Sequence, residues 1–442
     1  MSDEKAVTFR EAFWVWVKVA IYSFGGPAGQ IAVMHKMVVE EKKWVNESRF
    51  LHALNYCMLL PGPEAQQLAI YLGWLLHGTR GGLVAGTLFV LPGFSSILGL
   101  SVLYAVFHQV TLVQGLFFGL KPAVMAVVLE AVIKIGRRAL KNNVMLGLAI
   151  LSFIAIFFFN IPFPLIILTA GFIGYAGGYL KLPQFSTAAN TPTDTVDELR
   201  NPTRPSWGRT ARILAIGLTL WFAPLLLLVE MFGRESIFVR QGLFFSQMAM
   251  VTFGGAYSAL VYVAQQAVEV YGWLTPREML DGLGMAETTP GPLIQVVQFV
   301  AFMGAYRQPG LLHPIAAGVI ASMITTWVTF VPCFIWIFLG APYIEQLRGH
   351  RALSTALAAI TAAVVGVILN LAVWFSLHTI FGVVNVLYTG PIRWQIPVAA
   401  TLDGAALVIA LIAGVMLFYY KRGMLETLAG CALLGLGVYV VR

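Results

Sequence analysis

The chain has 442 residues, of which 59% are hydrophobic and 11% charged, and its mean hydropathy is +0.81. Soluble proteins carry about 25% charged residues, so the composition excludes an ordinary soluble globular protein. The net charge of +8 does not indicate a nucleic-acid partner, because the basic residues lie beside apolar segments and no basic domain lies apart from them. The composition instead predicts a chain that lives in the lipid bilayer.

The chain begins with ten residues of mixed charge, and no small-residue cleavage site follows the apolar residues 13–22. This pattern argues against a removed signal peptide. Later apolar stretches include residues 144–160, 213–228 and 407–419. Segments of about 18 apolar residues or more can cross a hydrocarbon core of about 30 Å. We therefore predict an all-α polytopic protein of the cell inner membrane.

Two groups of helix-breaking residues interrupt the first apolar segments. The first group is Ser23-Phe24-Gly25-Gly26-Pro27, and the second is Pro61-Gly62-Pro63, followed by Glu64, Gln66 and Gln67. Proline removes a backbone donor and glycine exposes the backbone, so both motifs predict interrupted helices.

The same motifs recur further along the chain. Thr252-Phe253-Gly254-Gly255 and Thr289-Pro290-Gly291-Pro292, with Gln295, repeat the first set at an offset of 229 residues. Pro92-Gly93-Phe94 likewise matches Pro332-Cys333-Phe334 at an offset of 240, which places Glu130 on Asn370. A register kept over so many residues predicts an internal repeat.

The polar residues 181–212 separate the two repeats and are interpreted as a linker. One further apolar stretch, 213–228, precedes the second repeat, and a single extra span inserts that repeat upside down. The predicted organisation is a first membrane half at 1–180, a linker with one orienting helix at 181–239, and an inverted second half at 240–442. Inverted repeats with broken helices are common in secondary transporters.

The number of spans is open at this point. Counting every apolar stretch gives about 13 spans but places the basic loop 36–49 outside, against the positive-inside rule. We favour nine full spans plus four re-entrant hairpins broken at the Phe-Gly-Gly and Pro-Gly-Pro motifs. This arrangement makes the N-terminus cytoplasmic and most basic clusters cytoplasmic too.

Helices that restart after these breaks predict an anion site, because they present free N–H groups and a positive dipole end. Neutral donors beside the breaks suit a tetrahedral oxyanion. The alternative is that the motifs only allow close helix packing. The predicted substrate-binding residues at the breaks are Ser23, Gly25, Gly26, Pro27, Pro61, Gly62, Pro63, Gln66, Gln67, Thr252, Gly254, Gly255, Thr289, Pro290, Gly291, Pro292 and Gln295.

Ionisable residues inside a membrane are functional candidates. Lys121 could neutralise an anionic substrate, and Glu64 or Glu130 could carry a coupled proton. The alternatives are a favourable acid at a helix N-terminus for Glu64 and snorkelling to the interface for Lys121 and Glu130.

Nothing in the sequence indicates an enzyme or a metal site. His-Glu-x-x-His, Gly-x-Ser-x-Gly and Walker motifs are missing, and the three cysteines are scattered among apolar segments. We expect no cofactor and no metal.

The motifs resemble those of the chromate ion transporter family, of the long two-domain type. The resemblance is carried by the break motifs of both halves together with Val39-Glu40-Glu41-Lys42-Lys43-Trp44 and Phe89-Val90-Leu91-Pro92-Gly93-Phe94. The second half departs from the family pattern at Ala256, where a proline is expected, and at Cys333, where a glycine is expected.

The resemblance implies export of chromate across the cytoplasmic membrane, coupled to the proton gradient and conferring chromate resistance. It implies chromate as the partner and sulfate as its competitor. A passive anion channel or a porter of sulfate or another oxyanion is the alternative, and the assembly, with a homodimer as one candidate, is open.

Overall fold

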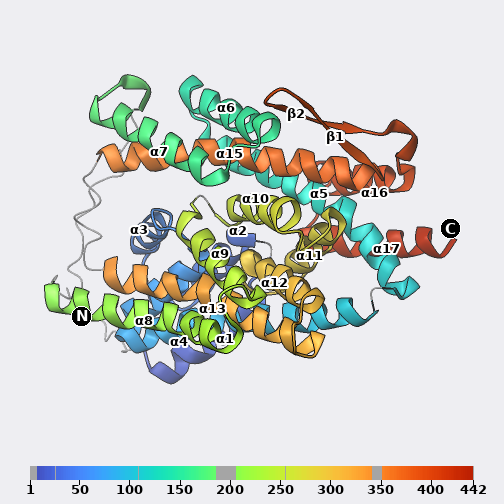
Figure 1. Cartoon of the computed structure of the whole chain (residues 1–442). Helices are drawn as coiled ribbons and strands as arrows, with labels where there is room; N and C mark the ends of the chain where they lie inside the picture. Colours follow the sequence, from blue (N-terminus) through green and yellow to red (C-terminus); the bar gives the residue numbers. More distant parts are fainter. Residues whose placement is uncertain are drawn as a thin grey trace.

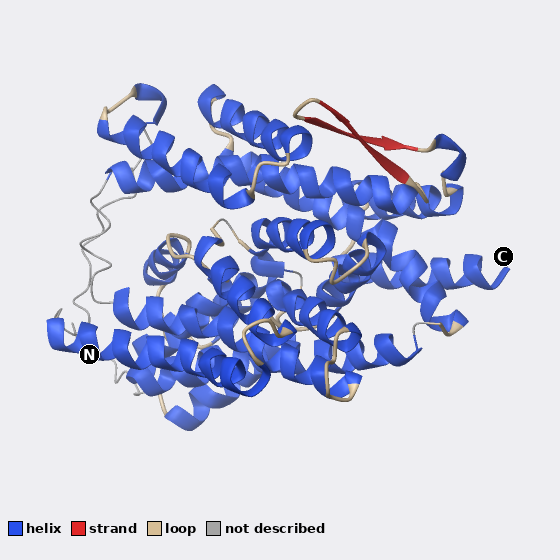
Figure 2. Ribbon diagram, in the orientation of Figure 1, coloured by secondary structure: helices blue, strands red, loops and turns tan. Residues whose placement is uncertain are grey.

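The computed structural model describes residues 7–24, 26–107, 109–185, 206–253, 255–340 and 351–441. Within them the chain is helical almost throughout (Figure 2). Six of the described helices are long and apolar enough to cross a membrane: Glu64–Phe107, Thr111–Ala139, Trp207–Phe232, Pro314–Gly340, Ala352–Ile380 and Met424–Val441. The predicted all-α polytopic class is confirmed.

The first half consists of short helices followed by long ones. Its elements are α1 (Phe9–Tyr22), α2 (Gly26–His35), the π-helix η1 (Lys36–Glu41), α3 (Glu47–Cys57), α4 (Glu64–Phe107), α5 (Thr111–Ala139), α6 (Asn143–Phe159), α7 (Phe163–Tyr179) and the short η2 (Pro183–Phe185). Within α4, His77 and Gly78 leave helical geometry, so this element is a short arm joined to a long helix.

The second half repeats this order after α8 (Trp207–Phe232). Its elements are α9 (Ile237–Val251), α10 (Ala256–Ala264), the π-helix η3 (Gln265–Val270), α11 (Pro276–Thr288), η4 (Leu293–Gln295), α12 (Val296–Arg307), α13 (Pro314–Gly340), α15 (Arg351–Ile380), β1 (Val384–Thr389), β2 (Ile392–Pro397), η6 (Ala399–Thr401), α16 (Gly404–Gly414), the π-helix η7 (Val415–Tyr419) and α17 (Met424–Val441).

Equivalent elements begin at equivalent residues. Elements η1 and η3, and α3 and α11, start 229 residues apart, and α5 and α15 start 240 apart. The same kind of local signal starts α3 and α11: the side chains of Asn46 and Thr275 each accept a hydrogen bond from a first-turn N–H and so cap the helix.

The antiparallel hairpin β1–β2 was not predicted. From α6 and α16 onwards the offset is 261 residues, because the hairpin and its flanking turns lie between α15 and α16 and have no counterpart between α5 and α6. The predicted linker at 181–212 falls largely outside the described residues, while the predicted orienting span corresponds to α8.

The long helices run roughly parallel in two layers (Figure 1). Helices α5, α6, α7 and α15 lie with the hairpin on one side, and α1, α4, α8 and α13 on the other, with α10 and α11 between them. In the layer with the hairpin, each half supplies one helix that packs against the other half. Helix α15 of the second half packs on α6 and α7, and α5 of the first half packs on α16 and α17. The two halves therefore form one body.

Small residues make this exchange possible. A Cβ atom on Gly119 of α5 would lie 1.9 Å from the carbonyl oxygen of Cys431 on α17. A Cβ atom on Gly178 of α7 would lie 1.9 Å from Oγ1 of Thr355 on α15. Such close backbone approach is the usual basis of helix association in lipid.

Besides the six long apolar helices, the described part of the chain holds the shorter apolar helices α6, α7 and α16 and four pairs of short helices at the breaks. The nine-span arrangement stays a prediction, as does inversion of the second half.

Candidate functional site

Each Phe-Gly-Gly motif separates two short helices. Helix α1 ends at Tyr22 and α2 begins at Gly26, while α9 ends at Val251 and α10 begins at Ala256. Two of the predicted site residues, Gly25 and Gly254, lie outside the described residues. The helix start at Ala256 shows that the proline expected there is not required for the break.

The hydroxyl groups before the breaks bond their own helices. Ser23 Oγ donates to the Val19 carbonyl at 2.6 Å, and Thr252 Oγ1 donates to the Met248 carbonyl at 2.6 Å. Both side chains are fully buried. Each hydroxyl proton is therefore already used, and neither hydroxyl offers a donor to an anion in this conformation.

The breaks of the two halves are joined by two equivalent backbone hydrogen bonds. The Gly62 N–H donates to the Thr252 carbonyl at 2.8 Å, and the Gly291 N–H donates to the Ser23 carbonyl at 2.9 Å. These bonds are related by the 229-residue offset, and each runs from the Pro-Gly-Pro motif of one half to the Phe-Gly-Gly motif of the other. Both glycines have a positive φ, +118° at Gly62 and +97° at Gly291.

A third motif completes each pairing. The ideal Cβ position of Gly93 is 3.0 Å from the Pro290 carbonyl oxygen, and that of Gly62 is 2.9 Å from Cys333 Sγ. Gly93 and Cys333 are the equivalent residues of the Pro-x-Phe motifs, which lie inside the helices α4 and α13, so each Pro-Gly-Pro motif is enclosed by the Phe-Gly-Gly break and the Pro-x-Phe motif of the opposite half. We call these six joined motifs the break cluster.

Glu64 lies at the start of α10. Its carboxylate oxygens are 3.6 and 3.7 Å from the ideal Cβ position of Gly255, the residue that precedes this helix. At the start of α2, the residue equivalent to Glu64 is Leu293, which is apolar. Leu293 lies 4.0 Å from the ideal Cβ position of Gly26. A helix N-terminus attracts negative charge, so Glu64 occupies a place that suits an anion.

Glu287 and Tyr257 stand beside the other helix start. Tyr257 donates its hydroxyl hydrogen to Glu287 Oε1 at 2.7 Å, and its oxygen lies 3.8 Å from the ideal Cβ position of Gly26. Thr289 is buried and donates to the Ala286 carbonyl at 3.3 Å, at the end of α11. The second half therefore contributes a buried acid near the first half's break.

The glutamines that follow the Pro-Gly-Pro motifs are buried and incompletely bonded. Neither polar side-chain atom of Gln66 has a hydrogen-bond partner among the described residues, and the residue is fully buried. Gln67 donates to the Pro61 carbonyl at 2.7 Å, and its Oε1 has no partner in the same part of the chain. Unpaired buried amides are rare and costly, so Gln66 and Gln67 are candidate ligands of a polar substrate.

In the second half the amides bond one another. Gln295 Nε2 donates to Gln298 Oε1 at 2.5 Å and to Thr326 Oγ1 at 3.0 Å. Gln298 in turn donates to the Phe94 carbonyl of the first half at 3.1 Å. Only Gln295 Oε1 lacks a partner among the described residues of this network. The two halves thus share a scaffold but differ in free polar groups.

The remaining predicted prolines start helical segments. Pro27 is the second residue of α2, Pro63 precedes α4, and Pro292 precedes η4. Proline fits these positions because the first N–H groups of a helix have no internal partner. The sequence analysis missed Gln30, which is buried and donates to the Gly291 carbonyl at 2.6 Å. The equivalent residue in the second half is Ala259, so comparison of the two repeats did not reveal Gln30.

Lys121 is not a free countercharge. Its Nζ lies 3.1 Å from Asp281 Oδ1, and Tyr104 donates to Asp281 Oδ2 at 2.8 Å. Asp281 and Tyr104 were missed because neither belongs to a repeated motif. The other predicted ionisable residue of α5, Glu130, pairs with Lys134 at 2.6 Å, whose side chain is 65% exposed.

The described residues contain no group of three or more His, Cys, Asp or Glu side chains placed to hold a metal ion. The break cluster consists of backbone groups, amides, the partly buried Glu64 and the buried Glu287. Paired helix breaks of this kind, inside a bundle of long apolar helices, define a polytopic membrane protein with a polar interior site of the sort that transporters use.

Comparison with known proteins identifies the family. The sequence profile described as "Chromate transporter" matches residues 10–175 and again residues 239–436, so the chain belongs to the chromate transporter family. Both halves match the same profile. The resemblance inferred from the motifs is confirmed, and the chain is a multi-pass membrane transporter rather than an enzyme.

Curated relatives match over nearly the whole chain. A "Chromate transport protein" of Pseudomonas aeruginosa is 30% identical over 82% of this chain and 80% of its own length. A protein of the same name from Cupriavidus metallidurans is 25% identical over 98% of this chain and 94% of its own. A "Probable chromate transport protein" of Synechococcus elongatus is 25% identical over 93% and 96%. No solved structure matches.

The crowding at Gly291 gives a stability prediction. Its ideal Cβ position is 3.0 Å from both Cα and N of Gly93, so Gly291→Ala adds steric overlap to the strain of a positive φ. Gly390→Ala is the matched control, because Gly390 has φ +61° and no atom within 4 Å of its ideal Cβ position. We expect a loss of about 1–2 kcal/mol for the control and a further loss of about 1–3 kcal/mol for Gly291→Ala.

Thermal unfolding of the purified protein in detergent measures the difference. Equal midpoints for the two variants would contradict the close contact between Gly291 and Gly93.

Proposed function

We propose that the chain is a secondary active transporter that exports chromate across the cytoplasmic membrane, with the proton gradient as its energy source. The observation that carries this proposal is the break cluster, where interrupted helices of both halves meet around buried amides without partners. The names of the curated relatives support chromate as the substrate. Chromate resistance of the cell is the expected consequence.

The chemistry of the break cluster favours a tetrahedral oxyanion. Helix N-termini at Gly26 and Gly255 and the amides of Gln66 and Gln67 provide neutral donors. Lys121 is paired with Asp281, so it does not act as a free positive charge that would hold the anion tightly. Weak neutral ligands suit a carrier, because the substrate must also be released. Sulfate has the same shape and charge and is expected to compete.

Glu64 is the proposed proton-coupling residue. When it is ionised, its carboxylate occupies the positive end of α10 and repels an oxyanion. Protonation removes that repulsion, so proton binding and oxyanion binding are linked with the same sign. A dianion that leaves with one proton still carries a net negative charge, and the inside-negative membrane potential drives that charge outward. Glu130 is a weaker candidate, because Lys134 already compensates its charge.

The packing of the two halves supports a carrier that alternates between two states. Helix α10 packs on α15, and α11 packs on α5, α15 and α17. The equivalent helices α2 and α3 make no comparable contact with α5, α15 or α7 among the described residues. One end of the molecule is therefore closed and the equivalent end is loose, which is the asymmetry that exchange between two packed states produces in repeat-built transporters.

With the N-terminus in the cytoplasm, the loose end faces the cytoplasm. The basic loop after η1 then lies on the cytoplasmic side, in agreement with the positive-inside rule. This orientation, the inner-membrane location and the inversion of the second half form part of the proposal.

Replacing the free amides separates transport from stability. Gln66→Leu removes two buried polar atoms that have no partner in the described structure, so we expect stability to be kept or raised while chromate transport falls about tenfold or more. Gln295→Leu should also reduce transport but should cost stability, because it breaks two hydrogen bonds.

Gln241→Leu is the matched control, since Gln241 is buried and bonds the Ala301 carbonyl away from the break motifs. It should lower stability without a specific transport defect. Unchanged chromate kinetics in both Gln66→Leu and Gln295→Leu would remove these residues from the site.

Proton coupling is tested in everted membrane vesicles. An imposed proton gradient that makes the vesicle interior positive should drive chromate uptake by the wild-type protein at a rate that depends on pH, and Glu64→Gln, which mimics the protonated acid, should transport chromate without that pH dependence. Glu130→Gln should keep the wild-type response. Wild-type flux that ignores the gradient and exceeds carrier rates by orders of magnitude would instead indicate a passive anion channel.

A further inference from the structure

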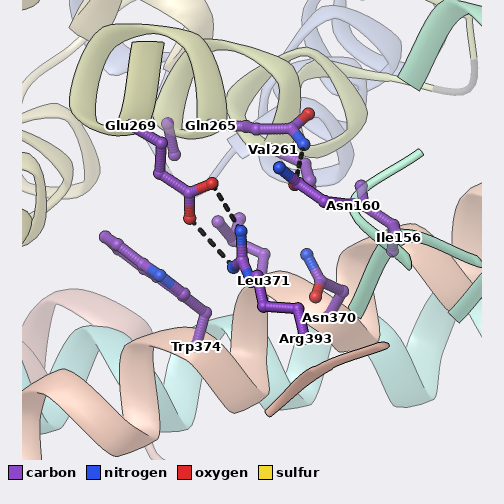
Figure 3. Close-up of a pocket in the computed structure, with 10 residues that line it drawn as sticks. Ile156, Asn160, Val261, Gln265, Glu269, Asn370, Leu371, Trp374 and Arg393 are labelled. Atoms are coloured by element: carbon purple, nitrogen blue, oxygen red, sulfur yellow. Dashed lines mark hydrogen bonds and ion pairs between the residues drawn. The ribbon is translucent and has the colours of Figure 1, made fainter. Parts of the chain in front are cut away.

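A second polar pocket lies beside α10, towards the end of this helix remote from the break (Figure 3). Five elements line it: α10 itself, the end of α6 with the following Asn160, η3 with Gln265 and Glu269, α15 with Asn370, and β2 with Arg393. Arg393 comes from the hairpin that has no counterpart in the first half. None of these residues belongs to the break cluster.

Arg393 is held in the pocket by a partly buried ion pair, in which the arginine is buried and Glu269 reaches the surface. Its Nη1 lies 2.7 Å from Glu269 Oε2 and its Nη2 lies 3.0 Å from Glu269 Oε1, so the guanidinium grips both carboxylate oxygens (Figure 3). The residue is only 7% exposed, because it is the inward-facing position of β2. Such two-pronged geometry is the way arginine recognises carboxylates and tetrahedral oxyanions.

Two polar atoms of this pocket lack partners among the described residues. Nε of Arg393 is buried and donates to nothing, and Oε1 of Gln265 is buried and accepts nothing. The other end of the Gln265 amide donates to Asn160 Oδ1 at 2.5 Å. Asn370 points into the same space from α15 (Figure 3). Buried groups without partners in one pocket indicate a ligand that the protein binds there.

The donors favour an anion. The guanidinium and the amides of Asn160 and Asn370 can all donate, and the carboxylate of Glu269 occupies the place that two oxygens of a free oxyanion would take. A cation would meet the guanidinium, which carries a permanent positive charge. The chemistry therefore fits an oxyanion that displaces Glu269 from Arg393.

The pocket also lies across the closed end of the molecule. Glu269 belongs to η3, which continues α10, and α10 packs on α15 at this end. The Arg393–Glu269 pair thus ties the helix that begins at Gly255 to the hairpin. Releasing Glu269 removes that tie. Asn370 and Trp374 correspond to Glu130 and Lys134 in the first half, so the repeat provides no such pocket at the other end.

We propose that this pocket is a second oxyanion site, in which Arg393 exchanges Glu269 for the transported anion at the hairpin end of the pathway. The proposal rests on the transport of an oxyanion proposed above. It assigns to Arg393 a role in binding and to Glu269 a role as the competitor that closes the site in the absence of the anion.

The experiment measures protection of a thiol inside the pocket by sulfate, a redox-inactive oxyanion. Asn370→Cys is introduced into the full chain, whose native cysteines are all buried, and its rate of modification by an anionic thiol reagent is followed in detergent. The half-protecting sulfate concentration is compared in this background, with Glu269→Gln and with Arg393→Gln. The control substitutions are Arg240→Gln and Glu235→Gln, which break an exposed ion pair outside the pocket.

Opposite shifts are expected from the two pocket substitutions. Glu269→Gln should lower the half-protecting concentration about tenfold, and Arg393→Gln should raise it about tenfold, because a charged hydrogen bond is worth roughly one such factor or more. The two controls should match the parent. Shifts in the same direction would show that the ion pair is only a structural tie, and no protection in the parent or in Glu269→Gln would exclude the site.

Two further measurements keep the result interpretable. If Arg393→Gln fails to fold, Arg393→Lys keeps the charge without the two-pronged geometry and should still weaken protection. Gln66→Leu in the Asn370→Cys background should leave the half-protecting sulfate concentration unchanged. A negative result for oxyanion binding at the break cluster can therefore be distinguished from a negative result for this pocket.

Discussion

The structure depends on the need to pair backbone groups inside a membrane. Helix breaks at Phe-Gly-Gly leave carbonyl groups at Ser23 and Thr252 without helical partners, and an unpaired backbone group in lipid costs several kcal/mol. The N–H groups of Gly291 and Gly62 satisfy these carbonyls, each from the opposite half. Neither half can close its own breaks. The two halves must therefore assemble around each other, and the exchange of α5 and α15 between them has the same consequence.

The shared backbone scaffold carries unequal side chains. Glu64, Gln30 and the unpaired Gln66 belong to the first half, and their equivalents are Leu293, Ala259 and Gln295. The second half adds Glu287 and Tyr257 near the first break. The equivalent breaks of the two halves thus share one backbone arrangement. The acids and the amides without partners are distributed unequally between the two halves. Such inequality is what a carrier needs if its two end states are to bind proton and anion differently.

The sequence predicted those structural features that depend on residues adjacent in the chain. The clustered Phe-Gly-Gly and Pro-Gly-Pro motifs favour interrupted helices, whereas single prolines such as Pro92 and Pro122 lie inside helices. The breaks, their repeat and the extra apolar helix α8 were therefore readable without coordinates. The partners across the breaks were not, because the bonds of Gly62 and Gly291 run between halves. Lys121 was read as a free charge for the same reason, since Asp281 is distant in sequence. The hairpin β1–β2 was missed because its apolar residues resembled those of the neighbouring helices.

The proposed function depends on binding of the transported oxyanion at the break cluster. A structure of the full chain with tungstate, a heavy and redox-inactive tetrahedral dianion, tests this most directly. We expect strong anion density in the break cluster, within hydrogen-bond reach of the N-terminus of α2 or α10 and of the Gln66 amide. Density confined to the Arg393 pocket or to the protein surface, with the break cluster empty at saturating tungstate, would contradict it.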